Sequence, residues 1–393
     1  MNESYYSLGL MSGTSGDGID ASIIKSDGQS QYKPVVDKYF EYDSETTKKI
    51  NQIKNKIDYH SFKSERSRIK KELDEEINSL EKKITLLHAD AANDVLKDFK
   101  ENLDFIGFHG HTIQHLPHKS YTRQLGDGKL LSKLTKKTVI YNFRQNDMKN
   151  GGNGAPLAPI FHQQMIYQIG FDLPITIFNL GGIANVTHLW RDLFYKEKLV
   201  CNANDIGPGN CLIDSWIKKN SNHKFDIEGN IAKSGKVDKI LLDKEFDTFI
   251  QKKNIGRRSL ADLPSLDIND FDISFVSGLS LEDGAATLTE YTTKILALYF
   301  NTDKFINNEN GSDFIKILAC GGGRKNNFLI QSLQKKIKQK ILNIDEFGIN
   351  GDFVESQAFA YLAIRSYLKL PISFPETTGC KIPSSGGVIA KNF

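Results

Sequence analysis

The sequence predicts an α/β protein with two domains. Three observations support this prediction: a length of 393 residues, an alternation of short apolar strands with amphipathic helical stretches, and three glycine-rich turns that each follow an apolar strand. A chain of this length exceeds one ordinary hydrophobic core. Alternating strands and helices are typical of α/β domains. The three turns lie at residues 12–18, 181–182 and 321–323.

The predicted elements of the first half follow from its apolar periodicity and its turn residues. In order, they are a hairpin over residues 5–25, a strand over 35–42, helices within 45–100, strands over 104–108 and 139–143, a glycine-rich loop over 151–156 and a helix from Leu157.

The second half again opens with a hairpin around a glycine turn. Its predicted elements are a hairpin over residues 174–189, a strand over 199–203 ending at Asp205, a turn over 207–210, helices over 211–218 and near 240–251, a long helix over 279–300, a strand over 314–320, a helix over 326–341, a strand over 342–344 and a helix over 352–368. This repetition favours two related domains.

Composition excludes several classes of protein. Hydrophobic residues make up 39% of the chain and charged residues 25%, as in soluble globular proteins. A net charge of +3 gives no reason to expect nucleic acid or an acidic membrane as a partner. No run approaches a membrane span, the first apolar stretch is too short for a signal peptide, and the four cysteines lack disulfide or zinc spacing. We therefore expect a cytoplasmic protein.

The glycine turns are candidate phosphate-binding sites. Glycine allows positive φ and close approach of backbone N–H groups, and concave rows of such groups bind phosphate oxygens. No G-x-x-x-x-G-K-[ST] motif is present, which excludes a Walker-type loop. The alternatives are an ordinary surface turn and a tight strand-to-helix connection. The candidate nucleotide residues are Ser12, Gly13, Thr14, Ser15, Gly16, Asp17, Gly18, Gly181, Gly182, Gly321, Gly322, Gly323 and Asn326, and Asp17 could orient Mg²⁺ through water.

Four histidines fall within ten residues, at positions 109, 111, 115 and 118. Their spacing does not match a standard metal pair, so we favour hydrogen bonding to substrate by His109 and His111 at a strand end. Arg144 suits a carboxylate or polar sugar, while a salt bridge between Arg144 and Asp147 is the alternative. Glu355 could face the site or could only favour its helix N-terminus.

Asp205 is the candidate catalytic group. It comes at the predicted end of a strand, just before the rigid turn Gly207-Pro208-Gly209 and a helix. A carboxylate held in this way can act as a general base. Helix capping is the alternative, but the turn places Asp205 several residues from the capping position.

The motifs of this chain, taken in order, closely resemble those of the anhydro-N-acetylmuramic acid kinases of bacterial cell-wall recycling. The matching motifs are Met11-Ser12-Gly13-Thr14-Ser15-x-Asp17-Gly18, His109-Gly110-x-Thr112, Phe143-Arg144, Gly151-Gly152-x-Gly154-Ala155-Pro156-Leu157, Asn179-x-Gly181-Gly182-x-x-Asn185, Asp205-x-Gly207-Pro208-Gly209-Asn210 and Cys320-Gly321-Gly322-Gly323.

The resemblance implies two RNase H-like domains of the actin, Hsp70 and sugar-kinase superfamily, with a nucleotide cleft between them. It implies a first domain of residues 1–143 with 371–393 and a second of residues 144–370. It also implies ATP and Mg²⁺ as cofactors, 1,6-anhydro-N-acetylmuramic acid as substrate and a homodimer. The implied reaction hydrolyses the anhydro ring and phosphorylates oxygen 6.

The resemblance also implies roles for individual residues. Asp205 falls on the general base, and Arg144 and Asp147 fall on sugar-site positions. We take His109, His111, Gly207 and Glu355 as further candidate substrate contacts. Gly16 stands where a larger apolar residue is usual, His111 replaces a usual glutamine, and Asn142 replaces a usual aspartate before Phe143-Arg144. A conventional sugar kinase and a non-catalytic nucleotide-binding module are the alternative functions.

Overall fold

The computed structural model describes residues 3–13, 15–61, 67–191, 199–255, 266, 268–302 and 315–393. The chain divides into two compact units, one of residues 1–170 with 353–393 and one of residues 171–352. The sequence placed these boundaries at 143/144 and 370/371. The structure differs because α5 (Pro159–Ile169) and α12 (Val354–Tyr367) pack against strands or helices of the first unit.

The first unit is built on a seven-stranded sheet with the order β12-β6-β4-β1-β2-β3, in which β5 also pairs with β4. β1 runs parallel to β4, and β4 parallel to β6, whereas β2 is antiparallel to both of its neighbours. The strands are β1 (Tyr5–Ser12), β2 (Gly18–Ser26), β3 (Tyr32–Glu41), β4 (Phe105–Leu116), β5 (Tyr121–Leu125), β6 (Thr138–Tyr141) and β12 (Val388–Ala390).

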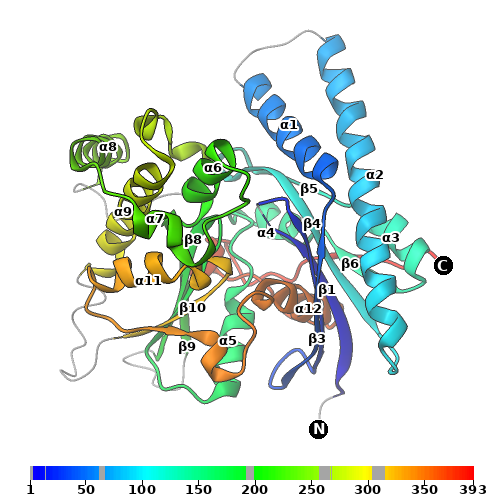
Figure 1. Ribbon diagram of the computed structural model, residues 1–393. Coiled ribbons are helices and arrows are strands. Elements are labelled where there is room, and N and C mark those ends of the chain that lie inside the picture. Colours follow the sequence, from blue (N-terminus) through cyan, green and yellow to red (C-terminus); the bar gives the residue numbers. More distant parts are fainter. Residues whose placement is uncertain are drawn as a thin grey trace. The chain divides into compact units, whose positions relative to one another are not determined.

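Helices cover both faces of this sheet. Leu8, Leu10 and Phe108 belong to the same buried cluster as apolar residues of α2, whereas α12 contacts the face that carries Gly9 and Gly107. A Cβ at Gly9 would lie 1.8 Å from the Ser356 carbonyl oxygen, so glycine is what lets α12 approach so closely. Figure 1 shows α1 and α2 as a helical pair that extends beyond the sheet. The remaining helices of the unit are α1 (Ser44–Ser61), α2 (Ser67–Asp98), α3 (Gly128–Thr135), α4 (Phe143–Lys149) and α13 (Pro375–Thr378).

The second unit is built on a five-stranded sheet with the order β11-β10-β7-β8-β9. β7, β10 and β11 are parallel, and β8 is antiparallel to both of its neighbours. The strands are β7 (Ile175–Leu180), β8 (Ile183–Arg191), β9 (Leu199–Pro208), β10 (Lys316–Cys320) and β11 (Ile341–Asn343). Its helices are α6 (Cys211–Asn220), α7 (Asn230–Ser234), α8 (Lys239–Lys252), α9 (Leu281–Phe300) and α11 (Asn327–Gln334). The long helix α9 is largely buried in the core of this unit.

Five strands of the first sheet follow the same order as the five strands of the second, which confirms the predicted α/β fold. In both units a first hairpin is followed by a third antiparallel strand and then by two strands parallel to the first, as the orders β3-β2-β1-β4-β6 and β9-β8-β7-β10-β11 show. This is the RNase H-like arrangement. Several element lengths differ from prediction, two of them for a reason that the hydrogen bonds show. β4 continues to Leu116 because β5 pairs with its second half, and α11 ends at Gln334, whose side chain binds the backbone of Gln339 and Ile341.

Candidate active site

The first glycine turn, residues 12–18, joins β1 to β2 and is closed by backbone hydrogen bonds. The Gly16 N–H donates to the Gly13 carbonyl at 3.1 Å. The Tyr42 N–H donates to the Asp17 carbonyl at 2.8 Å, which ties the turn to the residue that follows β3. These hydrogen bonds fix the shape of the turn without a ligand. A preformed loop of this kind suits a binding site.

Side-chain oxygen atoms that could bind a metal ion lie on the exposed side of this turn. Ser15 Oγ donates to Asp17 Oδ1 at 2.6 Å, and both residues are exposed. An exposed carboxylate with a neighbouring hydroxyl fits a hydrated Mg²⁺, which prefers oxygen ligands and retains waters. Thr14 lies outside the described residues.

Ser12 and His111 are partners across the parallel pair β1 and β4. Ser12 Oγ lies 3.1 Å from His111 Nδ1, and both side chains are buried. Burial, together with nearby cationic groups, holds the pKa of His111 well below its usual value, so this imidazole is neutral near pH 7. A Cβ at Gly16 would lie 3.4 Å from His111 Cε1, which places the glycine turn directly against this ring.

His109 and Arg144 are in direct contact. Arg144 donates to His109 Nε2 from Nε at 3.2 Å and from Nη2 at 2.9 Å, and its Nη1 donates to the Gly154 carbonyl at 2.8 Å. Burial and the adjacent guanidinium hold the pKa of His109 well below its usual value. Both histidines lie within β4 rather than at its end, which corrects the prediction that they follow the strand.

Asp147 is a buried residue of α4 that organises the neighbouring loop. Its Oδ2 accepts from the Gly154 N–H and its Oδ1 from Thr378 Oγ1, both at 2.6 Å. The Gly152 N–H donates to the Asp147 carbonyl at 3.0 Å. These contacts give Asp147 a role in holding the glycine-rich loop beside Arg144. Glu355 is a half-buried residue in the first turn of α12.

The Gly181-Gly182 turn between β7 and β8 is held by the start of α6. The Asn210 N–H donates to the Gly181 carbonyl at 2.8 Å, and the N–H groups of Gly209 and Cys211 donate to the Gly182 carbonyl at 2.9 and 3.3 Å. A Cβ at Gly209 would lie 2.1 Å from the Gly181 oxygen, so a larger residue would force the two segments apart. The second turn and the helix start thus form one rigid piece.

Asp205 lies inside β9, three positions before the strand ends at Pro208, and not at the strand end predicted. The register with β8 shifts beside it, because Asn185 pairs with Asp205 and Ala184 pairs with Gly207. Such a bulge redirects side chains and often occurs next to active sites. Asp205 Oδ2 accepts from the Leu266 N–H at 3.0 Å. Gly207 faces α9, where a Cβ would lie 2.9 Å from Ile295 Cγ2.

The third turn follows β10 and packs against the end of β7. Gly321 has φ +78°, and a Cβ there would lie 2.4 Å from Asn179 Oδ1, while a Cβ at Gly323 would lie 2.4 Å from Leu180 Cγ. A Cβ at Gly322 would meet nothing within 4 Å. Two of the three glycines are therefore required by packing, and the middle one faces open space within the described structure.

A buried guanidinium, which the sequence interpretation missed, supports this third turn. The Arg324 side chain is 2% exposed. It binds Asp345 through Nε and Nη2, binds Asp352 through Nη1, and donates from Nη1 to the Gly321 carbonyl at 3.0 Å. The signal available in the sequence was a cation directly after the three glycines. Asn326 caps α11 by accepting from the Leu329 N–H, so its side chain has a structural role beside the turn.

The structure thus brings the predicted residues together in groups. In the first unit, Ser12 contacts His111 and Arg144 contacts His109. In the second unit the two glycine turns converge on the start of α6, because a Cβ at Gly323 would also lie 2.8 Å from Asn210 Nδ2.

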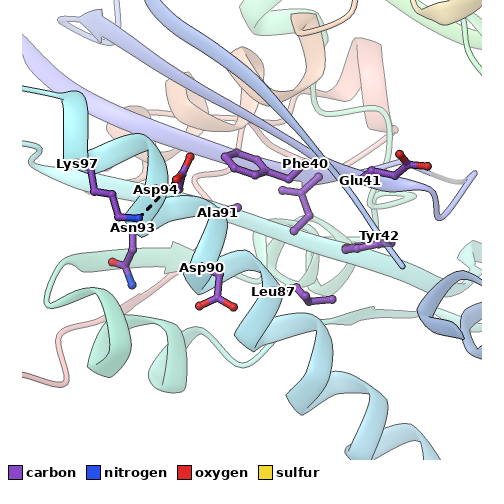
Figure 2. Close-up of a pocket in the computed structure, with 10 residues that line it drawn as sticks. Phe40, Glu41, Tyr42, Leu87, Asp90, Ala91, Asn93, Asp94 and Lys97 are labelled. Carbon is purple, nitrogen blue, oxygen red and sulfur yellow. Dashed lines mark ion pairs between the residues drawn. The ribbon is translucent and has the colours of Figure 1, made fainter. Parts of the chain in front are cut away.

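A surface cavity of about 470 Å³ lies elsewhere on the first unit, between β3 and α2 (Figure 2). Its lining includes Phe40, Tyr42 and Asp94, and none of its lining residues belongs to the predicted site. In the described parts of the chain, no group of three or more His, Cys, Asp or Glu side chains is placed to hold a metal ion. None of the described helices combines the length and apolar character of a membrane span.

Two RNase H-like units with glycine-rich hairpin turns define a protein of the actin, Hsp70 and sugar-kinase class. Residues 5–392 match the family model described as anhydro-N-acetylmuramic acid kinase. The chain is also 46% identical over 395 residues to the anhydro-N-acetylmuramic acid kinase of Pelagibacter ubique, covering 100% of both chains. The corresponding protein of Zymomonas mobilis is 37% identical, with 97% of this chain and 98% of the relative covered. The chain therefore belongs to the anhydro-N-acetylmuramic acid kinase family.

Two solved structures are similar to this chain at low sequence identity. Component A of the (R)-2-hydroxyglutaryl-CoA dehydratase of Acidaminococcus fermentans is 12% identical, with a TM-score of 0.44 and coverage of 93% of this chain and 100% of that one. Gluconate kinase from Lactobacillus acidophilus is 10% identical, with a TM-score of 0.36 and coverage of 93% and 90%.

Proposed function

We propose that this kinase uses ATP to convert 1,6-anhydro-N-acetylmuramic acid to N-acetylmuramic acid 6-phosphate and ADP in the recycling of cell-wall peptidoglycan. The observation that carries the proposal is the family match over residues 5–392, which includes every predicted site residue. The geometry of Asp205 and of the glycine turns supports it.

The proposed reaction couples two bond changes at one oxygen. A water oxygen forms a bond to the anomeric carbon while the bond between that carbon and oxygen 6 breaks. Oxygen 6 then carries the electron pair to the γ-phosphorus of ATP, and ADP leaves. An ordinary inverting glycosidase needs a second carboxylic acid to protonate the leaving oxygen. Here the phosphoryl group takes that place, so one carboxylate suffices.

Asp205 is the proposed base that accepts the proton of the attacking water. A general base must be held in position, and Asp205 is held by the bulged β9 strand and by the Leu266 N–H. The hydrogen bond engages Oδ2 and fixes the orientation of the carboxylate.

The glycine turns are proposed to bind ATP. Phosphoryl transfer depends on positioning and charge neutralisation, which preformed backbone donors supply. We assign the first and second turns to the phosphates and Gly321–Gly323 with Asn326 to the nucleoside. Asp17 would hold Mg²⁺ through water, and the ion would neutralise charge on the phosphates.

Arg144 is proposed to bind the carboxylate of the muramic acid. A guanidinium recognises a carboxylate through paired N–H groups, and Arg144 is fixed by His109 and Gly154. Asp147 would act by holding the Gly154 loop, and His111, Gly207 and Glu355 are assigned to the sugar side of the site. We also propose a cytoplasmic homodimer, for which light scattering of the purified protein is the direct test.

The deciding experiment measures ADP release with ATP, Mg²⁺ and the anhydro sugar, while mass spectrometry reads the product. We expect a gain of one water plus one phosphoryl group. A gain of the phosphoryl group alone would identify a conventional sugar kinase. Absence of sugar-dependent ADP release, with ATP still bound, would identify a nucleotide-binding module and refute the proposal.

A further inference from the structure

We infer that His109 is a positioning residue that aims the Arg144 guanidinium through a neutral imidazole acceptor, instead of contacting the sugar itself. The inference rests on the proposed function, because that function gives Arg144 its ligand. It revises the expectation that His109 binds substrate directly.

A β-bulge places His109 where it can do this. Leu10 pairs with Phe108 and Met11 pairs with Gly110, so His109 is the additional residue that β1 leaves without an opposite partner. A bulge of this kind redirects a side chain. Gly110 completes it with φ +73°, and a Cβ there would lie 2.1 Å from the Leu125 carbonyl oxygen. The backbone at this position therefore requires glycine.

The hydrogen bonds assign the tautomer of His109. A guanidinium has donors only, so His109 Nε2 must accept from Arg144. The ring proton then resides on Nδ1, which donates to the Gly110 carbonyl at 2.9 Å. The lone pair of Nε2 is occupied by Arg144, which leaves no ring nitrogen of His109 to accept from a sugar hydroxyl.

The surroundings bury this imidazole and keep it neutral. His109 is 6% exposed, and its ring packs on Phe359 of α12 with centroids 4.4 Å apart. The charged or titratable groups that act on it are Arg144 of α4, His88 of α2 and His115 of β4, and each of them disfavours a positive charge on the ring. A neutral acceptor orients the guanidinium without adding a negative charge that would compete with an anionic ligand.

Two variants distinguish the effect of the hydrogen-bond acceptor of His109 from the effect of the size of its ring. His109→Leu removes the acceptor, and His109→Gln offers an amide oxygen in its place. We expect His109→Leu to raise KM for the anhydro sugar about 10- to 100-fold, as for loss of a charge-assisted hydrogen bond, with KM for ATP unchanged. His109→Gln should stay within about threefold of the unmodified protein. His162→Leu, at a buried histidine of α5 outside the site, is the matched control and should leave KM for the sugar unchanged.

Equal KM values for His109→Leu and the unmodified protein would overturn the inference. So would an equal defect in His109→Leu and His109→Gln, or in His162→Leu, because the acceptor would then not be the cause. Thermal unfolding of each variant identifies any that fail to fold. Since Arg144 and His109 are proposed to act as one unit, adding His109→Leu to Arg144→Ala should cause no further loss.

A measurement that does not depend on catalysis tests this inference separately from the proposed function. Nitrogen-15 NMR of labelled histidine should show His109 with a protonated Nδ1 and an unprotonated Nε2 from pH 8 to pH 5, and His109→Leu should speed hydrogen exchange at Arg144 Nε. A protonated Nε2, or unchanged exchange at Arg144, would overturn the inference even if the enzyme is active. An unmodified protein without sugar-dependent turnover would refute the proposed function, while these spectra would still decide whether His109 orients Arg144.

Discussion

Asp205 Oδ2 accepts a hydrogen bond of 3.0 Å from the backbone N–H of Leu266, which joins the carboxylate to a segment far along the chain. The bond comes from the backbone, so it does not depend on the identity of the side chain at position 266. It also survives exchange of Asp205 for asparagine, whose amide oxygen still accepts. This relationship makes a clean test of the proposed base possible.

We predict that Asp205→Asn lowers kcat by about 10²- to 10⁴-fold, because an amide cannot accept the proton of the attacking water. The dissociation constant for ATP should stay unchanged, since the glycine turns are intact. Coupled ADP-release assays and calorimetric titration with ATP measure the two quantities. Turnover near that of the unmodified protein would show that another group is the base.

Gly321→Ala and Gly322→Ala form a matched pair on the third turn. Gly321→Ala introduces strain at φ +78° and a clash with Asn179, so we expect it to lower the free energy of unfolding by about 1–3 kcal/mol. Gly322→Ala meets no neighbour and should leave the midpoint of thermal unfolding unchanged. If the nucleoside lies on this turn, the added methyl group of Gly322→Ala should meet it, and KM for ATP should rise although the stability is unchanged. An unchanged KM would place the nucleoside elsewhere.

Arg324→Met should destabilise the second unit, because it leaves Asp345 and Asp352 without their buried cation. The two carboxylates are partly solvated, with side-chain exposures of 38% and 29%, so we expect a loss of about 2–3 kcal/mol, below that of a fully buried pair. Lys325→Met is the control. Lys325 pairs with the same Asp352 but is 61% exposed, and its loss should cost less than about 1 kcal/mol. Chemical denaturation measures both, and equal losses would contradict the assigned role of Arg324.

Asp27 should contribute to the loss of stability in acid. Burial alone would raise its pKa, but hydrogen bonds from the backbone of Gln29, Gln31 and Ser30 and from the Ser30 hydroxyl lower the pKa to about 2. A folded pKa below the unfolded value of 3.8 means that this stability is complete above that value and is lost as the pH falls towards 2. Unfolding measured from pH 6 to pH 2 should show a shallower acid dependence in Asp27→Asn. An identical slope would show that other carboxylates dominate.

Much of the fold could be predicted from local patterns in the sequence. Apolar runs and glycine turns are local signals, so both hairpins and all three turns were placed correctly. The bulges at His109 and beside Asp205 depend on pairing with another strand, and no local pattern reports them. The predicted strands therefore stopped at or before these residues.

The unit boundary and the contacts of the site depend on segments that are distant in the sequence, so local patterns could not predict them. The packing of α12 on β1, β2 and β4 assigns residues 353–370 to the first unit, and this contact spans most of the chain. Gly16 and His111, two of the three positions at which the resemblance implied unusual residues, are neighbours in space, since a Cβ at Gly16 would lie 3.4 Å from the His111 ring. The sequence showed two separate differences, whereas the structure shows that they share one space.

The division of the chain also bears on its synthesis. The second unit is continuous, so its strands and helices are all available once residue 352 has left the ribosome. The first unit needs α12 against its sheet and β12 beside β6, and both belong to the final segment of the chain. Domains made first usually fold first. On this principle the order would be reversed here, because the N-terminal sheet keeps one face uncovered until residues 353–367 have been synthesised.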